Sequence, residues 1–221
     1  MTEAVLRVVS WNVRSLRDDR ELVTTTLRDL HPDLVFIQEA PRFLRWRSKC
    51  AQLARRCGMF VVVGGRTAGD SLLLASLRVK VLDARAVMLS QQPGLHRRGL
   101  AMANVQVDGR RVTVASSHLG LEANQRLRHA GEIVSLLEQS AIPVVLGSDV
   151  NETPDGPAWQ QLASRWPAVN ADGATFPSKA PRRRIDGIFT DLRVITAALH
   201  VDANSARATD HLPVVATLAL P

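Results

Sequence analysis

Ten short apolar runs, spread along almost the whole chain, are the feature that most constrains its fold. Each run has the composition of a β-strand. An Asp-Gly pair at 108–109 separates two alternating runs and predicts a β-hairpin. The runs occupy residues 5–13, 34–39, 59–65, 71–77, 79–89, 100–109, 111–119, 142–150, 184–191 and 212–220.

Fewer segments have a helical pattern. Residues 18–30 begin with two capping aspartates, and residues 41–57 begin with a proline, which is common at the first position of a helix. Residues 122–139 and 156–166 complete the predicted helices. The helix over residues 122–139 is expected to turn Leu127, Ile133, Val134 and Leu137 toward the core. In the second helix the apolar stripe consists of Phe43, Trp46, Cys50, Leu53 and Cys57, and the opposite face of Arg42, Arg45, Lys49 and Arg56. Many strands with helices between some of them predict an α+β or layered mixed α/β domain.

The composition is that of a globular protein. The chain has 221 residues, of which 46% are hydrophobic, and no apolar run is long enough to cross a bilayer. Residues 1–13 enter a strand pattern without the features of a signal peptide, which favours a cytoplasmic protein. Cys50 and Cys57 would lie about 10 Å apart along a helix. This separation is too large for a disulfide, so we expect two reduced thiols in the core.

An excess of positive charge favours polyanionic partners. The formal net charge is +7 at pH 7, and the isoelectric point is 10.8. Such a charge attracts nucleic acid, phosphorylated lipid and other phosphate esters. An arginine-rich proteome, which places arginine on every surface, gives the same composition. Charge alone therefore does not choose between these interpretations.

Polar residues lie beside six of the apolar runs. In the segment GSDVNETPDG, an Asp and an Asn directly follow a buried run, where a simple turn is the alternative interpretation. A charge flanked by core residues is costly unless it is paired or binds a metal. Six such clusters therefore predict a common rim at the strand ends. The clusters contain Asn12, Glu39, His118, Asp149 with Asn151, Asp186, and Asp210 with His211.

The chemistry of this set is that of a site for a hard cation. Carboxylate oxygens and an amide oxygen suit Mg²⁺, Mn²⁺ or Ca²⁺. With both cysteines away from the set and no other thiols in the chain, a Cys-ligated zinc site is not expected. The histidines and carboxylates offer general acid–base groups and donors to a phosphoryl oxyanion. The sequence has no Gly-rich Walker loop, which argues against nucleotide-driven phosphoryl transfer.

These motifs, in this order, resemble those of the endonuclease/exonuclease/phosphatase superfamily, which has the DNase I-like fold. The matching segments are SWNVRSLR, FIQEA, SSHLGL, GSDVNETPDG, RRRIDGIF and TDHLPVV, and together they cover about residues 8–217. The resemblance implies a four-layer sandwich, in which two stacked mixed β-sheets are flanked by helices. It also implies a metal-dependent phosphoric ester hydrolase whose active site lies at one edge of the sheets.

The resemblance assigns roles to the acidic and amide residues of the rim. Asn12 and Glu39 correspond to metal ligands, with Glu39 the principal one, and Asp210 lies beside the metal. Asp149 and Asn151 match the pair that holds the attacking water and the scissile phosphate.

The two histidines are assigned in the same way. His211 matches the essential histidine of the final motif, and Asp186 matches the carboxylate that orients it, as a buried Asp holds an imidazole. His118 matches the second histidine of the DNase-like and phospholipid-hydrolysing branches. The alternatives are a buried salt bridge from Asp186 to an arginine at 182–184, and a structural role for His118. Arg98 occupies a place where related enzymes often have a phosphate-contacting arginine.

The chain departs from the family pattern at positions typical of two specialised branches. It has no Tyr, so it lacks any active-site tyrosine of the abasic-site branch. It also lacks, around Asp186, the Trp-Cys-Asp-Arg sequence of the inositol-phosphatase branch. Gly187 stands where a Tyr is common, and Asp70 with Ser71 stands where a Gly and apolar residues are more usual. These departures leave a general phosphodiesterase.

We therefore predict a phosphodiesterase that depends on Mg²⁺ or Mn²⁺ and acts as a small nuclease on DNA. We expect one domain over residues 1–221 and a monomer. The predicted substrate-binding residues are Arg42, Arg45, Arg98 and Arg184. The alternative is a phosphatase or phosphodiesterase for phospholipid, inositol or other small phosphate esters on the same site. A different alternative is an inactive scaffold that binds nucleic acid, and the complete set of rim residues argues against it.

Overall fold

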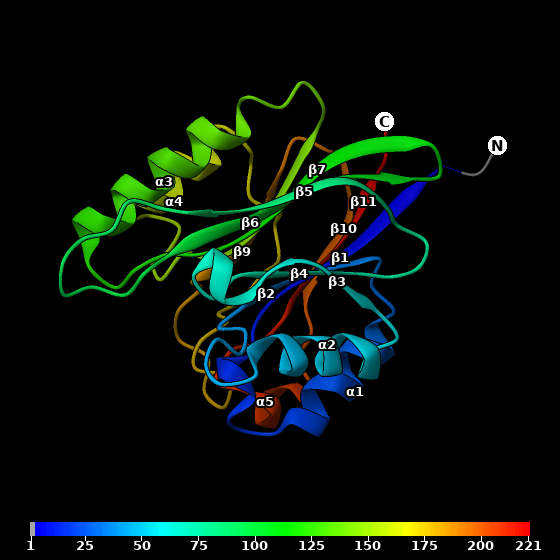
Figure 1. The fold of residues 1–221 in the computed structure, drawn as a ribbon, viewed down its shortest axis with the longest axis horizontal. Helices are drawn as coiled ribbons and strands as arrows, with labels where there is room; N and C mark the ends of the chain where they lie inside the picture. Colours follow the sequence, from blue (N-terminus) through cyan, green and yellow to red (C-terminus); the bar gives the residue numbers. More distant parts are fainter. Residues whose placement is uncertain (1–2) are drawn as a thin grey trace.

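Two mixed β-sheets stack face to face at the centre of the structure, a computed structural model that describes residues 3–221. Helices cover the outer faces of both sheets (Figure 1). The first sheet consists, in spatial order, of β10 (Val194–Leu199), β11 (Val214–Ala219), β1 (Val5–Asn12), β2 (Leu34–Gln38), β4 (Leu72–Ala75) and β3 (Phe60–Gly64). The second consists of β5 (Lys80–Met88), β6 (Gly99–Val107), β7 (Arg110–His118), β8 (Val144–Asp149) and β9 (Asp186–Thr190). The predicted fold class, a four-layer α/β sandwich, is confirmed.

Three apolar clusters hold the four layers together. One lies between the sheets and includes Phe36, a second packs Leu27 and its neighbours under the first sheet, and a third packs Ile133 under the second. The sheets come close at Gly147 of β8, where a Cβ atom would lie 2.4 Å from the Cβ atom of Phe36. The first sheet is covered by α1 (Arg20–Leu30), α2 (Trp46–Arg56) and α5 (Ser205–Ala208). The second sheet is covered by α3 (Ala123–Leu137) and α4 (Pro157–Ala163). Two short 3₁₀ turns are η1 (Arg14–Leu16) and η2 (Gly65–Ala68). Between residues 3 and 221, no helix combines the length and hydropathy needed to cross a bilayer.

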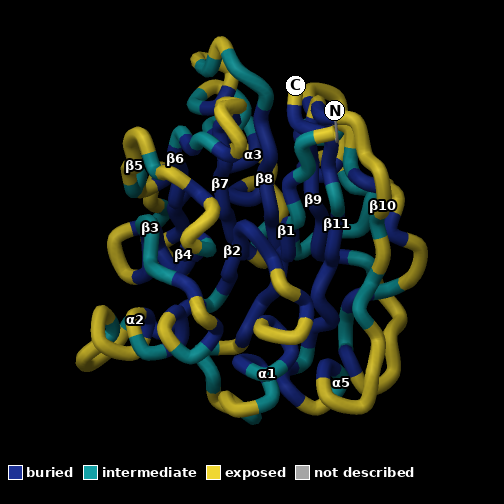
Figure 2. Tube along the Cα trace, turned by 90° about the vertical axis from the view of Figure 1, so that its right-hand side faces the viewer, coloured by how far each residue is buried: buried dark blue, intermediate teal, exposed yellow. Residues whose placement is uncertain are grey.

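All ten predicted strands are present, and one further strand is not among the predictions. The predicted hairpin joins β6 to β7, and both of its turn residues have left-handed φ angles, 48° at Asp108 and 80° at Gly109. The unpredicted strand is β10, which lies at the edge of its sheet and is largely exposed (Figure 2). Its sequence, VITAAL, is an apolar run like the others, so the pattern was present and the prediction overlooked it. The short helix α5 was not predicted either.

Helix α2 begins at Trp46, so the predicted start at Pro41 is wrong. Arg45, at its N-terminal cap, has a left-handed backbone conformation with a φ of 58°, and this conformation interrupts any helix that approaches from Pro41. Phe43 therefore lies in a turn and is 63% exposed instead of joining the buried stripe. The thiol of Cys50 is buried and free, as is that of the second cysteine, which confirms the predicted reduced pair.

Helix α3 is present, but its predicted core face is partly wrong. Leu127 is 40% exposed, whereas Ile133 and Leu137 are buried as expected. The side chain of Glu122 caps the first turn by accepting hydrogen bonds from backbone amides. His129 takes a buried place on the inner face, and its Nε2 atom lies 2.8 Å from the carbonyl oxygen of Ser90, to which it donates. A polar residue with a backbone partner thus occupies part of the face that leucine was expected to fill.

Candidate active site

The topology of the two sheets brings the predicted rim residues to one edge. β1 and β2 are parallel, and so are β7 and β8, so their carboxyl ends meet there. His118 ends β7 and lies in register with Asp149, which ends β8. β9 runs antiparallel to β8, and its first residue, Asp186, lies in register with the same Asp149. Asn12, at the end of β1, extends toward this edge from the first sheet.

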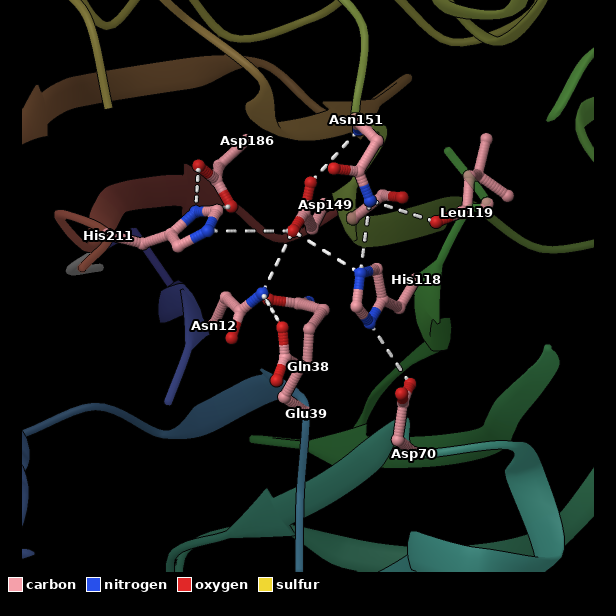
Figure 3. Close-up of polar contacts among 12 residues, drawn as sticks. Asn12, Gln38, Glu39, Asp70, His118, Leu119, Asp149, Asn151, Asp186 and His211 are labelled. Atoms are coloured by element: carbon pink, nitrogen blue, oxygen red, sulfur yellow. Dashed lines mark hydrogen bonds and ion pairs between the residues drawn. The ribbon is translucent and has the colours of Figure 1, made fainter. Parts of the chain in front are cut away.

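Asp149 is the centre of the polar network (Figure 3). Its side chain is 1% exposed, and its Oδ2 atom accepts a hydrogen bond of 2.9 Å from Nδ2 of Asn12. The same oxygen lies 3.5 Å from Nε2 of His118 and 3.9 Å from Nε2 of His211. A single carboxylate therefore faces both histidines. Its other oxygen accepts a hydrogen bond of 2.9 Å from the backbone amide of Asn151.

The turn that follows β8 brings the side chains of Asp149 and Asn151 to the same site. β8 ends at Asp149, and Asn151 has a left-handed φ of 57°, so the two side chains converge through a tight turn and not through strand alternation. Glu39, just beyond β2, has a φ of 51° in the same region. Left-handed conformations are uncommon outside glycine and carry a cost in strain, and they concentrate at functional sites.

His211 and Asp186 form a buried pair. Nδ1 of His211 lies 2.9 Å from Oδ2 of Asp186, and the ring of Phe176 lies against the imidazole at 4.9 Å between centroids. The indole nitrogen of Trp11 donates 2.9 Å to the carbonyl oxygen of His211, which holds its backbone. Burial alone would lower the pKa of His211, but the carboxylates of Asp186 and Asp149 outweigh it and raise the pKa to about 10. The alternative partner for Asp186, an arginine at 182–184, makes no ion pair with it in the described chain.

His118 has a carboxylate partner that the motifs did not identify. Its Nδ1 atom lies 3.1 Å from Oδ1 of Asp70 and 2.8 Å from Nη1 of Arg98. Arg98 can only donate and the carboxylate of Asp70 can only accept, so these two contacts at Nδ1 require opposite tautomers of His118. On the other side of the ring, Nε2 lies 3.1 Å from Nδ2 of Asn151. The Nδ2 assignment is supported because the same atom donates 2.9 Å to the carbonyl oxygen of Leu119.

Asp70 is held as a carboxylate by its neighbours. Nη1 of Arg98 lies 2.9 Å from its Oδ2 atom, and a guanidinium nitrogen of Arg42 lies 3.5 Å from it. Burial alone would raise the pKa of Asp70, but His118 and the two arginines hold it below its usual value. Its only signal in the sequence was that an Asp stands where the family usually has a Gly.

The four predicted substrate-binding arginines are not all at the same place. Arg98 is 6% exposed and lies beneath His118, and Arg42 is partly buried beside the same network. Arg45 is exposed at the start of α2 and faces a surface groove. Arg184 is turned away, with Nη2 2.6 Å from the carbonyl oxygen of Val169. Contact of Arg45 or Arg184 with a substrate would therefore need a substrate that extends well beyond the rim.

A cavity of about 260 Å³ opens onto this network, and we call it the central cavity. It gathers most of the predicted rim together with four side chains that were not predicted, namely Asp70, His96, Leu121 and Phe176. His96 and Phe176 lie in segments with no motif of their own, whereas Leu121 ends the motif SSHLGL and was not singled out within it. The predicted residues that line it are Glu39, Arg42, Arg98, His118, Asp149, Asn151, Asp210 and His211.

Oxygen donors in the central cavity fit a hard divalent cation. The carboxylates of Glu39, Asp149 and Asp210 all line it. Oδ1 of Asn12 accepts 2.9 Å from the backbone amide of Arg14, so the amide of Asn12 would have to rotate before its oxygen could bind a cation. Ligand atoms of Asp149, Asp186 and His211 also lie within 4.8 Å of one another. The oxygen donors thus form two sets that overlap at Asp149.

Comparisons with known proteins place the chain in a family. The model of the Endonuclease/Exonuclease/phosphatase family matches residues 9–211. The endonuclease/exonuclease/phosphatase from Bacteroides vulgatus has a TM-score of 0.82 at 17% identity, over 99% of this chain and 100% of that one. The mannosyl-6-phosphatase of Bacteroides thetaiotaomicron has a TM-score of 0.80 at 15% identity, over 97% and 100%. D. rerio TDP2, complexed with single-strand DNA product, has a TM-score of 0.73 at 20% identity, over 97% and 98%.

No curated protein sequence matches the chain. The two stacked mixed sheets define the class as the DNase I-like fold, which the solved structures share. The chain belongs to the Endonuclease/Exonuclease/phosphatase family, and the predicted membership is confirmed.

Proposed function

We propose that this protein is a phosphodiesterase that depends on Mg²⁺ or Mn²⁺ and acts as a small nuclease on DNA. The observation that carries the proposal is the buried Asp149, which faces two histidines, each backed by a carboxylate of its own. The net charge of +7 supports a polyanionic substrate. D. rerio TDP2, a structural neighbour, is complexed with single-strand DNA product, which supports DNA as the polymer. We also propose that the whole chain acts as one monomeric domain in the cytoplasm.

The residues of the central cavity would divide the work between proton transfer and charge. Asp149 would orient a water and accept its proton, with Asn151 held beside it. A protonated His211, fixed by Asp186, would place positive charge and a hydrogen-bond donor against a phosphoryl oxygen. His118 would contribute a second donor or acceptor from the other wall of the cavity.

The residues that would hold the cation are Glu39 and Asn12, with Asp210 beside them. When bound there, Mg²⁺ or Mn²⁺ supplies positive charge that polarises the phosphate and stabilises the leaving oxygen.

The experiment that tests the proposal is a substrate panel with and without EDTA. Single-stranded DNA, duplex DNA, RNA, bis(4-nitrophenyl) phosphate and 4-nitrophenyl phosphate would be compared. We expect cleavage of DNA and of the diester, loss of both in EDTA, restoration by Mg²⁺ or Mn²⁺, and loss in Asp149→Asn. Full activity in EDTA, or no cleavage of any diester, would contradict the proposal.

A second candidate function is hydrolysis of a small phosphate ester. The central cavity has a volume of about 260 Å³, enough for a compact group, and the mannosyl-6-phosphatase of Bacteroides thetaiotaomicron shares the fold. The same panel separates the two functions. Rapid hydrolysis of 4-nitrophenyl phosphate with DNA left uncut would favour the monoesterase.

A further inference from the structure

A second pocket opens beside the central cavity and shares one wall with it. This side pocket has a volume of about 320 Å³, at the lower end of the range for small-ligand sites, which begins at about 300 Å³. Asp210 lines both spaces. Phe176 lines the central cavity, and its neighbour Pro177 lines the side pocket. Asp210 therefore stands between the two pockets, which are neighbours on the same part of the molecule.

Charged side chains of both signs line the side pocket, with one more cation than carboxylates. Arg14, Lys179 and Arg207 face it, against the carboxylates of Asp18 and Asp210. Arg14 already pairs with both carboxylates, at 3.0 Å to Asp18 and 3.3 Å to Asp210. Arg14 carries one positive charge against these two carboxylates, and Lys179 and Arg207 give the pocket a net charge of +1.

Lys179 and Arg207 have no acidic partner. Among residues 3–221, neither side chain makes an ion pair or a hydrogen bond. Their backbones are nevertheless tied together. The amide of Ser178 donates 2.8 Å to the carbonyl oxygen of Asp210, and its hydroxyl donates 3.0 Å to that of Ala206. The two cations thus stand on fixed segments at the mouth of a defined pocket.

We propose that the side pocket binds the phosphate that neighbours the scissile phosphate in a nucleic acid strand. This inference rests on the proposed function, because it places the scissile phosphate in the central cavity. Lys179 and Arg207 are the binding groups, since a phosphate attracts unpaired cations and exchanges its counterions for them. Arg14 lines the pocket and offsets part of the negative charge of Asp210. A substrate with one phosphate has nothing to place there, so the pocket favours a polymer over a small ester.

The test compares two variants that each remove two positive charges. Lys179→Ala/Arg207→Ala empties the side pocket of its free cations. Arg110→Ala/Arg111→Ala is the matched control, because both arginines are exposed and begin β7, whose far end carries His118. At about 3.4 Å per strand residue, the control lies roughly 25 Å from the central cavity. Neither variant removes a side-chain hydrogen bond or ion pair of the described structure, so both should fold.

Binding of a fluorescein-labelled single-stranded oligothymidylate is measured in EDTA across a range of salt concentrations. For single strands, the slope of log affinity against log salt falls by about 0.7 for each phosphate that the protein no longer neutralises. We expect Lys179→Ala/Arg207→Ala to lower the slope by at least about 0.7 and the control to keep the wild-type slope. Equal slopes in the two variants, or no binding by the wild type, would overturn the proposal.

Hydrolysis of thymidylyl-thymidine, with and without an added terminal phosphate, separates this inference from the proposed function. We expect the kcat/KM of the wild type to be about tenfold higher for one of the terminally phosphorylated dinucleotides than for the dinucleotide without the added phosphate. The Lys179→Ala/Arg207→Ala variant should lose that preference. A wild type that cleaves both forms equally would overturn the inference and leave the proposed function intact. If the two double variants differ in salt slope but the wild type cleaves no diester, the proposed function would be overturned and the side pocket would remain as an anion site.

Discussion

At the scale of single residues, the buried pair of His211 and Asp186 carries a direct prediction. Asp186→Asn and His211→Ala should each lower kcat by about 10²-fold, because each removes or misorients a donor to the transition state. Their double variant should lose far less than the product of the two, since the residues act as one unit. Steady-state kinetics on DNA measures all three. His200→Ala, at the end of β10 and outside the central cavity, is the control and should keep wild-type kcat.

The protonation of His211 gives a second prediction at this scale. Its pKa is about 10 in the folded protein against 6.5 in the unfolded chain, because nearby carboxylates outweigh burial. A raised pKa stabilises the fold fully below about pH 6.5, and this contribution is lost as the pH rises toward 10. The imidazole NMR signals of His211 in metal-free protein should stay those of the charged ring at pH 8 and shift near pH 10. In Asp186→Asn the same signals should titrate at lower pH, and an unchanged titration would show that Asp186 does not hold the proton.

At the scale of elements, the close approach of β8 to β2 predicts that a methyl group added between the sheets destabilises the fold, whereas a methyl group added in a helix does not. Gly147→Ala should lower the free energy of unfolding by about 1–3 kcal/mol, because the added Cβ would overlap Phe36 between the sheets. Gly131→Ala is the matched control. It lies in α3, meets only the flexible amide of Gln161, and should be neutral or stabilising as alanine is in a helix. Urea denaturation in EDTA checks both, and equal effects would contradict the close approach of the two strands.

Some elements of the structure could be predicted from the sequence, and others could not. The strands and the rim were accessible, because apolar runs mark strands and a polar residue at the end of each run is conspicuous. The start of α2 was not accessible, since Pro41 fits a helix start and only the left-handed Arg45 shows that the helix begins later. Asp70 was missed because its partners, His118 and Arg98, are distant in the chain and meet it only where the two sheets come together.

At the scale of the whole molecule, the central cavity spans the junction of the two sheets. Glu39 and Asn12 come from the first sheet, and Asp149 comes from the second. Carboxylates that face one another across this junction repel each other when no cation is present. A divalent cation bound there would therefore join the sheets as well as serve the chemistry, and its binding would be visible in the stability of the fold.

Mg²⁺ or Mn²⁺ should raise the Tm of the wild type in a concentration-dependent way, because a ligand that binds only the folded state stabilises it by mass action. Glu39→Gln should lose most of this shift, since a neutral amide binds a hard cation weakly. It should not lower the Tm in EDTA, because it also removes a negative charge near Asp149. Glu138→Gln removes an exposed carboxylate that pairs with Arg165 outside the cavity, and it should keep the full shift. Differential scanning fluorimetry across metal concentrations measures the effect. Equal shifts in Glu39→Gln and Glu138→Gln would place the cation elsewhere and would remove Glu39 from the proposed metal site.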